Sequence, residues 1–441
     1  MVVGSPQRVF AFGTSGAITL AQFVGEVRAV AALLPPAGFA LNLCEDRYRF
    51  IVALCAAALR GQTTLLPPSR APAVVAEMLA QHRDSYALTD VLAHGEAAVA
   101  AARPQWCLPA VLPQSEGETL ALPDDLLIAI GYTSGSTGRP KPNPKTWASF
   151  RASTAQNLAA LADLLDHDAQ TPLVATVPPQ HMYGMEMSVL LPLLGPVAVH
   201  GERPFFPADI ARALRDATTP PLLITTPVHL RALVESDAQL PHLRAIVSAT
   251  APLSRELALA AEARFGCEVR ELFGSTETCV IARRRTAHEA AWTPLPGVQL
   301  MPQPDGTAVQ APHLSQPVVL ADLVEVHADG RFELRGRNAD LIEIAGKRAS
   351  LGDLTRRLLA VPGVRDGTVF QLDPCPRTGV ARLAALAVAP ELDETVVLAA
   401  LRAHVDAVFL PRPLRLVGSL PRNETGKLPR AALAALVQQA L

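Results

Sequence analysis

Apolar residues recur along the first part of the chain with two different spacings, which predict alternating helices and strands. Residues 20–34 (LAQFVGEVRAVAALL) and 49–61 (RFIVALCAAALRG) have helical spacing, and the second run stops at Gly61, a residue type common at the ends of helices. Residues 39–43 (FALNL) form a short strand candidate between them. Farther along, four apolar runs each pass into a loop, at 172–179, 221–227, 243–254 and 267–278. With helix-like segments between them, these runs predict α/β architecture with ligands at the carboxyl ends of the strands.

The pattern changes in the last third of the sequence. Residues 285–337 are rich in strand and turn signals, including PDG and ADG turns. From about residue 340, a final stretch has enough helices and strands for a small domain of its own. A length of 441 residues also predicts two or three domains. We therefore expect a large N-terminal domain of α/β subdomains plus a β-rich subdomain, followed by a small α+β domain.

Composition narrows the possible classes of protein. The chain is 49% hydrophobic and 18% charged, which is ample for a buried core, and its net charge of -2 argues against a general nucleic-acid binder. The longest apolar runs, such as 187–199, are short and interrupted by proline, so we expect no membrane span. The N-terminus shows no signal-peptide pattern, and the six cysteines form no CxxC pair. These features predict a cytoplasmic protein with reduced cysteines.

The stretch YTSGSTGRPKPNPKTWAS (132–149) follows a predicted strand at 126–136 and indicates an anion site. Glycine and small hydroxyl residues leave backbone N–H groups accessible, and lysine adds a mobile positive charge, which together suit a phosphate. The Walker pattern GxxxxGK and the hydrolase pattern GxSxG are both absent. A flexible glycine-serine loop and the Ser/Lys site of an amidase are the alternative interpretations.

Three further stretches carry candidate groups. In RELFGSTET, Phe273 offers an aromatic face for a base and Glu277 a carboxylate able to hold Mg²⁺. In LADLVEVHADGRFELRGR, Asp322 and Arg337 could bracket a ribose through its hydroxyls. In LPRNETGKLPR, Lys427 follows a glycine in a polar loop. Taken singly, FGSTET is better explained as an ordinary strand end and Lys427 as a solvated surface charge, and the stretch with Asp322 and Arg337 can be a surface β-hairpin.

Together and in this order, the stretches resemble the motifs of the adenylate-forming superfamily, which comprises acyl-CoA synthetases, nonribosomal peptide synthetase adenylation domains and luciferases. YTSGSTGRPK resembles its phosphate loop, PPQHMYGME the motif beside the substrate carboxylate, and SATAPLS the GGAPL-type turn beside the adenine. FGSTET resembles the YGxTE motif, and PRNETGKLPR the C-terminal catalytic-lysine motif. The resemblance runs from about residue 10 to the end. It implies that superfamily's fold, with an ATP- and acid-binding domain at 1–337, a hinge at 338–340 and a mobile lid domain at 341–441.

The resemblance also implies a set of site residues. Those expected to bind ATP are Thr133, Ser134, Gly135, Ser136, Thr137, Gly138, Lys141, Lys145, Ala251, Phe273, Gly274, Thr276, Asp322 and Arg337. Those expected to bind the acid are His181, Tyr183, Gly184, Ser248 and Thr250. The catalytic groups implied are Lys427, Glu277 and His181, and Glu277 would also hold Mg²⁺. The path of the thiol would pass Gly346 and Lys347, and the hinge would contain Ala339 and Asp340.

Several positions depart from the usual motifs. The phosphate loop usually continues PKG, whereas PKPNPKTW leaves both Lys141 and Lys145 as candidates and predicts a lid stiffened by prolines. Phe273 replaces the tyrosine of YGxTE, LAD replaces the usual TGD around Asp322, and Ala339 occupies the hinge position of GRNAD. The first hundred residues are also shorter than usual, which predicts a trimmed N-terminal subdomain.

The implied activity is that of an ATP-dependent acid–thiol ligase with ATP and Mg²⁺ as cofactors. Attack of a carboxylate on the α-phosphate would give an acyl-adenylate and pyrophosphate, and the acyl group would pass to the phosphopantetheine thiol of an acyl carrier protein or of coenzyme A. PQHMYGME and PKPNPKTW resemble stand-alone aryl- and acyl-acid ligases of aryl-polyene and xanthomonadin-type pigment biosynthesis, such as 3-hydroxybenzoate ligases. A hydroxybenzoate-like acid is therefore favoured, with Thr250 narrowing the acyl channel.

Other substrates and roles stay open at this point. A medium-chain fatty acid and an amino acid are the alternative substrates, and a non-catalytic nucleotide- or acyl-binding scaffold is the alternative role. The segment from residue 402 onward is locally basic, since it contains Arg412, Arg415, Arg422, Lys427 and Arg430 against Asp406 and Glu424. Such a surface would steer an acidic carrier protein, or the polyanionic coenzyme A. The run Arg283-Arg284-Arg285 is either a solvated surface or part of a docking patch.

Overall fold

The computed structural model describes the chain of 441 residues except for positions 69, 92–104, 118–120, 135–139, 167–169, 305, 338–340, 345–346, 373–381, 403, 423–427 and 440–441. Two compact units are present. Unit 1 comprises Met1–Glu289, Pro294–Val298 and Ala311–Gln316, and unit 2 comprises Ala290–Thr293, Gln299–Gln310 and Pro317–Leu441. The strands of the predicted β-rich subdomain after residue 298 thus belong mostly to unit 2, whereas the predicted hinge at 338–340 lies outside the described residues. The domain boundary at residue 337 stays a prediction.

The larger sheet of unit 1 has the strand order β15-β14-β13-β12-β11-β9-β10-β1-β2. Its strands are β1 (Val9–Gly13), β2 (Gly16–Thr19), β9 (Thr171–Ala175), β10 (Val197–His200), β11 (Leu222–Thr225), β12 (Ala245–Ser248), β13 (Glu268–Ser275), β14 (Cys279–Arg284) and β15 (Thr293–Pro294). The strands from β13 to β1 are parallel to their neighbours in this order, and β14 and β2 pair antiparallel. Every residue of β9, β10, β11 and β12 is buried, as continuous apolar runs in a two-sided sheet require. The strands predicted at 172–179, 221–227, 243–254 and 267–278 are confirmed.

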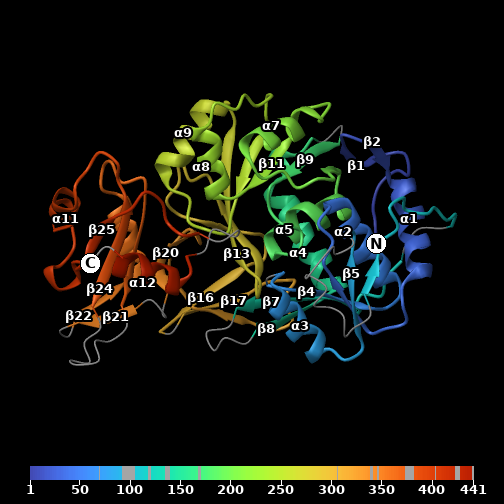
Figure 1. Cartoon of the computed structure of the whole chain (residues 1–441), viewed down its shortest axis with the longest axis horizontal. Coiled ribbons are helices and arrows are strands. Elements are labelled where there is room, and N and C mark those ends of the chain that lie inside the picture. Colours follow the sequence, from blue (N-terminus) through green and yellow to red (C-terminus); the bar gives the residue numbers. More distant parts are fainter. Residues whose placement is uncertain are drawn as a thin grey trace. The chain divides into compact units, whose positions relative to one another are not determined.

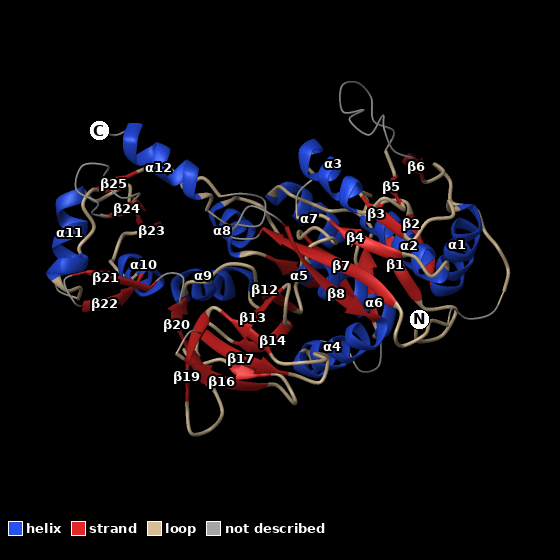
Figure 2. Cartoon of the chain, turned by 90° about the horizontal axis from the view of Figure 1, so that it is seen from below, coloured by secondary structure: helices blue, strands red, loops and turns tan. Residues whose placement is uncertain are grey.

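Three helices lie beside these strands (Figures 1 and 2). They are α7 (Pro207–Arg215), α8 (Pro227–Glu235) and α9 (Arg255–Phe265). Their shared core includes Leu230, Leu257 and Val269. The ends of α9 follow local rules, because Ser254 Oγ accepts a hydrogen bond from the Leu257 N–H and Gly266 closes the helix at φ 64°.

The second sheet of unit 1 has the order β6-β5-β3-β4-β7-β8. Its strands are β3 (Phe39–Asn42), β4 (Thr63–Leu66), β5 (Ser85–Thr89), β6 (Gln105–Cys107), β7 (Leu127–Ser134) and β8 (Pro140–Thr146). The helices of this region are α1 (Leu20–Leu33), α2 (Arg47–Leu59), α3 (Pro72–Gln81) and α4 (Trp147–Ala160). The predicted helices at 20–34 and 49–61 and the strand at 39–43 are confirmed, and Gly61 has the positive φ of 71° expected just beyond a helix.

Strand β8 corrects one prediction, because residues 140–146 form an edge strand and not a lid loop. It pairs only with β7 in the sheet order, and Pro142 and Pro144 are exposed whereas Asn143 and Lys145 are buried. Proline lacks a backbone N–H donor, so alternating prolines leave one side of a strand without donors. The prolines therefore protect the free edge of the sheet, and the residues between them point into unit 1.

Between β9 and β10 the chain forms three short helical segments. They are α5 (Met182–Met185), a π-helix (Glu186–Leu190) and α6 (Leu191–Leu194), and a 3₁₀ turn (Ala162–Leu164) precedes β9. Single π-turns within helical segments are often found at functional sites. Within the described residues, no helix has the length and apolar character needed to cross a membrane.

The described residues of unit 2 form small sheets and three helices. The strands are β16 (Gln299–Gln303), β17 (Gly306–Gln310), β18 (Val318–Leu320), β19 (Asp322–Val326), β20 (Phe332–Arg337), β21 (Leu341–Ile344), β22 (Lys347–Ser350), β23 (Asp366–Gln371), β24 (Leu383–Val388) and β25 (Leu414–Leu416). The helices are α10 (Leu351–Leu359), α11 (Glu394–Arg402) and α12 (Arg430–Gln439), with a 3₁₀ turn at Ala407–Phe409. Leu358 and Leu401 from the helices meet Ala385 of β24 in one buried core.

Candidate functional site

Polar residues gather where the parallel strands β9, β11 and β12 end. Thr225 pairs in register with Ser248, and Thr176 follows β9 directly. The Thr176 Oγ1 atom lies 3.1 Å from Thr225 Oγ1 and 3.0 Å from Nδ1 of His229. Burial, and secondarily the charge of Arg203, lowers the pKa of His229, so its ring is neutral at pH 7. The ends of these strands therefore carry buried hydroxyls and a neutral imidazole, and Thr176, Thr225 and His229 are bonded to one another.

Three predicted acid-binding residues lie in the segment 176–186, which follows β9 directly. The Tyr183 side chain is buried, and its hydroxyl donates to the Val247 carbonyl oxygen at 2.9 Å. The hydroxyl proton is therefore used in a bond to the backbone. Gly184 packs so closely on the preceding turn that a Cβ there would lie 1.9 Å from the Pro178 carbonyl oxygen. His181 is half-buried at the start of α5. The segment is thus held by the Tyr183 hydrogen bond to β12 and by close backbone packing at Gly184, and His181 is partly exposed.

A buried arginine that the sequence analysis did not identify binds the backbone at the start of this segment. Arg47, at the start of α2, is 0% exposed and donates to the carbonyl oxygens of Ala175 at 2.7 Å and Val177 at 3.0 Å. Its third partner is the hydroxyl of Ser188. Burial lowers the Arg47 pKa to about 9, so the guanidinium stays charged at neutral pH. The local sequence gives no signal for this role, because Arg47 stands among the polar residues EDRYR at 45–49.

The turn after β12 contains two more predicted acid-binding residues and one predicted adenine contact. The buried Ser248 Oγ and the buried Gln180 Oε1 have no hydrogen-bond partner in the described part of the protein. Thr250 is exposed and has a φ of 81°, and Ala251 beside it is half-buried. A threonine in the left-handed region is strained by about 1–2 kcal/mol, and such strain tends to occur at functional sites.

The hairpin turn between β13 and β14 carries the next predicted group of residues. Phe273, Thr276 and Glu277 are half-buried, and Gly274 is exposed. The backbone is tight, since a Cβ at Gly274 would lie 2.1 Å from the Cys279 carbonyl oxygen, and Cys279 has a φ of 58°. Glu277 therefore lies on a short turn whose backbone is closely packed.

The two candidate phosphate lysines occupy different environments on β8. Lys141 is exposed near the tip of the β7–β8 hairpin, and Thr133 and Ser134 end β7 opposite it. Lys145 is only 4% exposed, and its Nζ donates to the Glu277 carbonyl oxygen at 2.9 Å. The structure thus links the phosphate hairpin directly to the turn that bears Glu277.

The remaining predicted residues are either in unit 2 or outside the described residues. Asp322 of β19 is the cross-strand partner of Arg337 of β20, and Thr307 Oγ1 donates to the Asp322 carbonyl oxygen at 2.7 Å. Lys347 begins β22. Outside the described residues lie Gly135, Ser136, Thr137, Gly138, Ala339, Asp340, Gly346 and Lys427.

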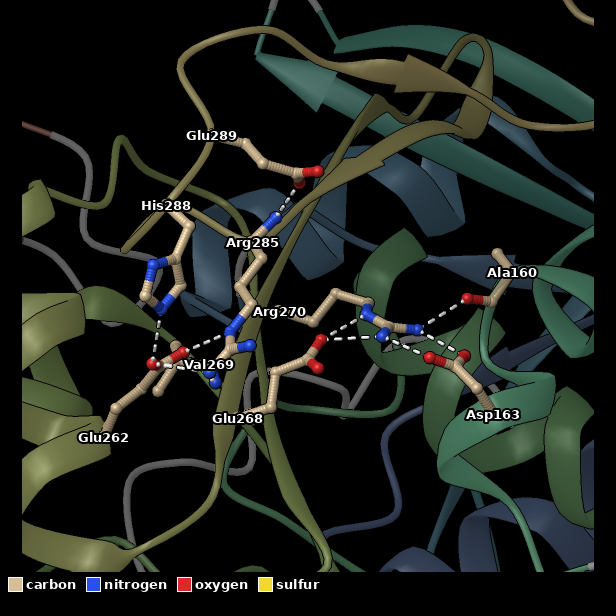
Figure 3. A network of polar contacts seen from close by, with 9 residues as sticks. All are labelled: Ala160, Asp163, Glu262, Glu268, Val269, Arg270, Arg285, His288 and Glu289. Atoms are coloured by element: carbon tan, nitrogen blue, oxygen red, sulfur yellow. Dashed lines mark hydrogen bonds and ion pairs between the residues drawn. The ribbon is translucent and has the colours of Figure 1, made fainter.

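The arginine run at 283–285 joins a network of ion pairs. Arg284 binds Glu271 at 2.7 Å, and Arg285 binds Glu262 at 2.9 Å. Figure 3 shows that Glu262 also meets His288, and that Arg270 bridges Glu268 and Asp163 from β13 to the turn after α4. These pairs serve the packing of β13 and β14, which favours the structural interpretation of the run over a docking patch.

Ion pairs also reduce the free positive charge near the C-terminus. Arg415 binds Glu394 at 2.9 Å, and Arg422 binds Asp366 at 2.7 Å. Two of the arginines counted toward a basic steering surface are therefore neutralised within unit 2. The expectation of charge steering rests on fewer groups than the sequence implied.

Comparisons with known proteins agree with one another. The sequence model of the AMP-binding enzyme family, described as "AMP-binding enzyme", matches residues 4–312. A 4-coumarate--CoA ligase of Rhodobacter capsulatus is 32% identical over 318 residues, which cover 70% of this chain and 77% of that protein. A fatty acid--[acyl-carrier-protein] ligase of Mycobacterium marinum is 30% identical over 125 residues, 27% of this chain and 23% of that protein. The crystal structure of ATP-bound MatB from Rhodopseudomonas palustris superimposes with a TM-score of 0.84 at 20% identity and covers 99% of this chain and 97% of its own.

Proposed function

The chain belongs to the family of AMP-binding enzymes and has the predicted adenylate-forming fold, and on this premise we propose which acid and which acceptor this ligase uses. It activates a hydroxybenzoate-like aryl acid as the acyl-adenylate and transfers the acyl group to a phosphopantetheine thiol. The observation that carries the adenylation step of the proposal is the 2.9 Å hydrogen bond from Lys145 to the Glu277 carbonyl oxygen. It brings the phosphate hairpin and the carboxylate turn, which lie far apart in the sequence, into one site.

Electrostatics determine the first half-reaction. An acid oxygen attacks the α-phosphorus of ATP, the bond from that phosphorus to the bridging oxygen breaks, and pyrophosphate leaves. Two anions must approach each other, so cations aimed at the developing charge lower the barrier. Lys141 is exposed at the hairpin tip and is the lysine we assign to the β- and γ-phosphates. Lys427 is assigned to the oxygens between the carboxylate and the α-phosphate.

Glu277 fits the requirements of a magnesium ligand. Magnesium is usually held by one or two carboxylates together with substrate phosphates and water, and not by a cage of side chains. No cluster of three or more His, Cys, Asp or Glu residues that could hold a metal occurs among the described residues. A bound ion would neutralise phosphate charge, and the half-buried Glu277 carboxylate would fix its place.

In the second half-reaction a thiolate attacks the acyl carbon and AMP leaves. We assign Gly346 and Lys347 to the path of the thiol, and 338–340 to a hinge that exchanges them with Lys427. An acyl carrier protein is the favoured acceptor, supported by the partial likeness to an acyl-carrier-protein ligase. The aryl preference is supported by the name and identity of the 4-coumarate--CoA ligase relative. A fatty acid is the second candidate, because the acyl-carrier-protein ligase relative is named for one.

ATP–pyrophosphate exchange tests the activity and the substrate together. We expect exchange with purified protein to be fastest for hydroxybenzoates in a panel that also contains cinnamates, medium-chain fatty acids and amino acids. Fastest exchange with a fatty acid would replace the aryl assignment by the second candidate. Exchange with none of the acids, including after addition of an acyl carrier protein, would contradict catalysis and favour a binding scaffold.

Substitution of Thr250 by glycine tests whether this residue limits the length of the acid. Glycine relieves the backbone strain at φ 81°, which stabilises the folded state, but it also raises the entropy of the unfolded chain, which destabilises it. Because the two effects oppose each other, the free energy of unfolding should change by no more than about 1 kcal/mol. Removal of the side chain should raise exchange with medium-chain acids about tenfold relative to hydroxybenzoate, the scale expected for one or two carbon atoms in a pocket. Thr218→Gly, in an exposed turn, is the matched control. An unchanged ratio in Thr250→Gly would show that Thr250 does not line the acyl channel.

A further inference from the structure

Lysine is scarce in this protein, which makes each lysine informative. The sequence contains 39 lysines and arginines, of which only Lys141, Lys145, Lys347 and Lys427 are lysines. Among the described residues, arginine supplies most of the ion pairs, as in the network around Arg270 and Arg285 (Figure 3). Lys145 is also buried, so it is not an ordinary surface cation. A buried ammonium needs a partner that compensates for lost hydration.

Lys145 has such partners on two sides. Its Nζ donates to the Glu277 carbonyl oxygen at 2.9 Å. The second partner is electrostatic: Glu186, in the π-helix, is 1% exposed, and burial raises its pKa to about 7 although Asn157, the Val280 backbone and Lys145 act in the opposite direction. Lys145 and Glu186 are therefore both buried beside the β13–β14 turn of unit 1.

Glu186 binds the other end of the same turn. Its carboxylate accepts the Val280 N–H at 3.0 Å and the Asn157 side-chain N–H at 2.9 Å. Val280 lies in β14, three residues after Glu277. Lys145 thus binds the turn at the Glu277 carbonyl oxygen, and Glu186 binds it at the Val280 N–H.

The rest of the turn is held by neutral contacts. His313 Nε2 donates to the Thr278 carbonyl oxygen at 2.6 Å, and the backbone N–H groups of Ser275 and Thr278 each donate to the side-chain hydroxyl of the other residue. The methyl group of Thr276 lies against β7, since a Cβ at Gly131 would come within 3.0 Å of it. The Glu277 peptide is the part of the turn that Lys145 fixes, and it carries the side chain assigned to magnesium.

We propose that Lys145 is a positioning residue, which fixes the Glu277 peptide through its hydrogen bond and thereby aims the Glu277 carboxylate at Mg·ATP. This inference rests on the proposed function, because that function assigns Glu277 to magnesium. It separates the two candidate lysines: Lys141 contacts phosphate, and Lys145 contacts the protein. The rival interpretation is that Lys145 itself turns to a phosphate when ATP binds.

Affinity for ATP, measured by calorimetry with saturating Mg²⁺ and again with EDTA, distinguishes the two interpretations. In Lys145→Met we expect the ratio of the ATP affinity in Mg²⁺ to the ATP affinity in EDTA to fall about tenfold, which is the scale for loss of one hydrogen bond from a charged donor. The ATP affinity in EDTA should stay unchanged. Direct phosphate contact would instead weaken binding in EDTA as well. Arg151→Met is the matched control, because Arg151 is a cation on α4 whose ion pair with Asp124 lies at the surface.

A double variant separates positioning from folding. Lys145→Met removes a nearby positive charge that favours the ionised form of Glu186, so the urea midpoint should fall, and adding Glu186→Gln should restore at least half of that loss. The Mg²⁺-dependent tightening should remain lost in the double variant, because the Glu277 carbonyl still lacks its donor. Recovery of stability and of Mg²⁺ tightening together would overturn the positioning role.

Amine acetylation followed by mass spectrometry measures the reactivity of each lysine in the wild-type protein. We expect Lys141 to react and to be protected by Mg·ATP, whereas Lys145 stays unmodified with or without ATP. Acetylation of Lys145 as fast as Lys141 would overturn the inference. The failures are distinguishable: absence of exchange with every acid overturns the proposed function, whereas unchanged Mg²⁺ tightening in Lys145→Met overturns only the positioning role.

Discussion

Substitution of Lys427 by alanine is expected to slow acid-dependent ATP–pyrophosphate exchange about 10²–10³-fold, the cost of losing one donor aimed at developing charge. Lys427 lies outside the described residues, so this expectation rests on the PRNETGKLPR motif and on the family. The effect should be confined to one half-reaction. If the hinge at 338–340 withdraws Lys427 after adenylation, transfer from chemically prepared acyl-adenylate to a phosphopantetheine thiol should change only a few-fold.

Arg430→Ala provides the control for loss of a positive charge in the same segment. Arg430 begins α12, and its guanidinium donates to the Gln371 carbonyl oxygen at 3.3 Å, so its removal should leave exchange near the wild-type rate. Both variants should also share the wild-type urea midpoint. Equal losses in exchange and in thiol transfer by Lys427→Ala would contradict the alternation of Lys427 with the thiol path.

Much of the fold was predictable because burial in a two-sided parallel sheet leaves a simple mark on the sequence. β9, β11 and β12 read as short apolar runs ended by polar residues, and each run ends where its strand ends. The positions of Ser248 and Glu277 near strand ends followed from the same pattern. Local rules were sufficient here, because pattern and tertiary structure agree.

Other features depend on contacts between distant segments and could not be read locally. PKPNPK looks like a loop, and its alternating prolines make sense only once β8 is known to be an edge strand. Lys145 looked equivalent to Lys141, since nothing in the sequence shows that one is buried against Glu277. His313 gave no signal at all. Glu186 gave a weak one, a single carboxylate beside the apolar run MSVLL.

Substitution of Gly184 by alanine is expected to have the largest effect on structure near the site. The added Cβ would lie 1.9 Å from the Pro178 carbonyl oxygen and 3.3 Å from the Pro179 Cα, and backbone atoms cannot turn away as a flexible side chain can. Relief requires the 178–184 segment to shift, at a cost of about 2–3 kcal/mol in the free energy of unfolding. Urea unfolding monitored by fluorescence measures this loss.

The same shift should damage activity in the protein that remains folded. His181 lies between Pro178 and Gly184, and displacement of a substrate-positioning group by about 1 Å can cost on the order of 10²-fold in rate. Gly13→Ala is the matched control, because a Cβ there would meet His200 at an ordinary 3.6 Å. The variant Gly184→Ala should therefore show slow exchange at denaturant concentrations far below its unfolding midpoint, whereas Gly13→Ala should match the wild type. Wild-type exchange by folded Gly184→Ala would mean that the acid is positioned by other elements, such as the hydroxyls at the ends of β9 and β11.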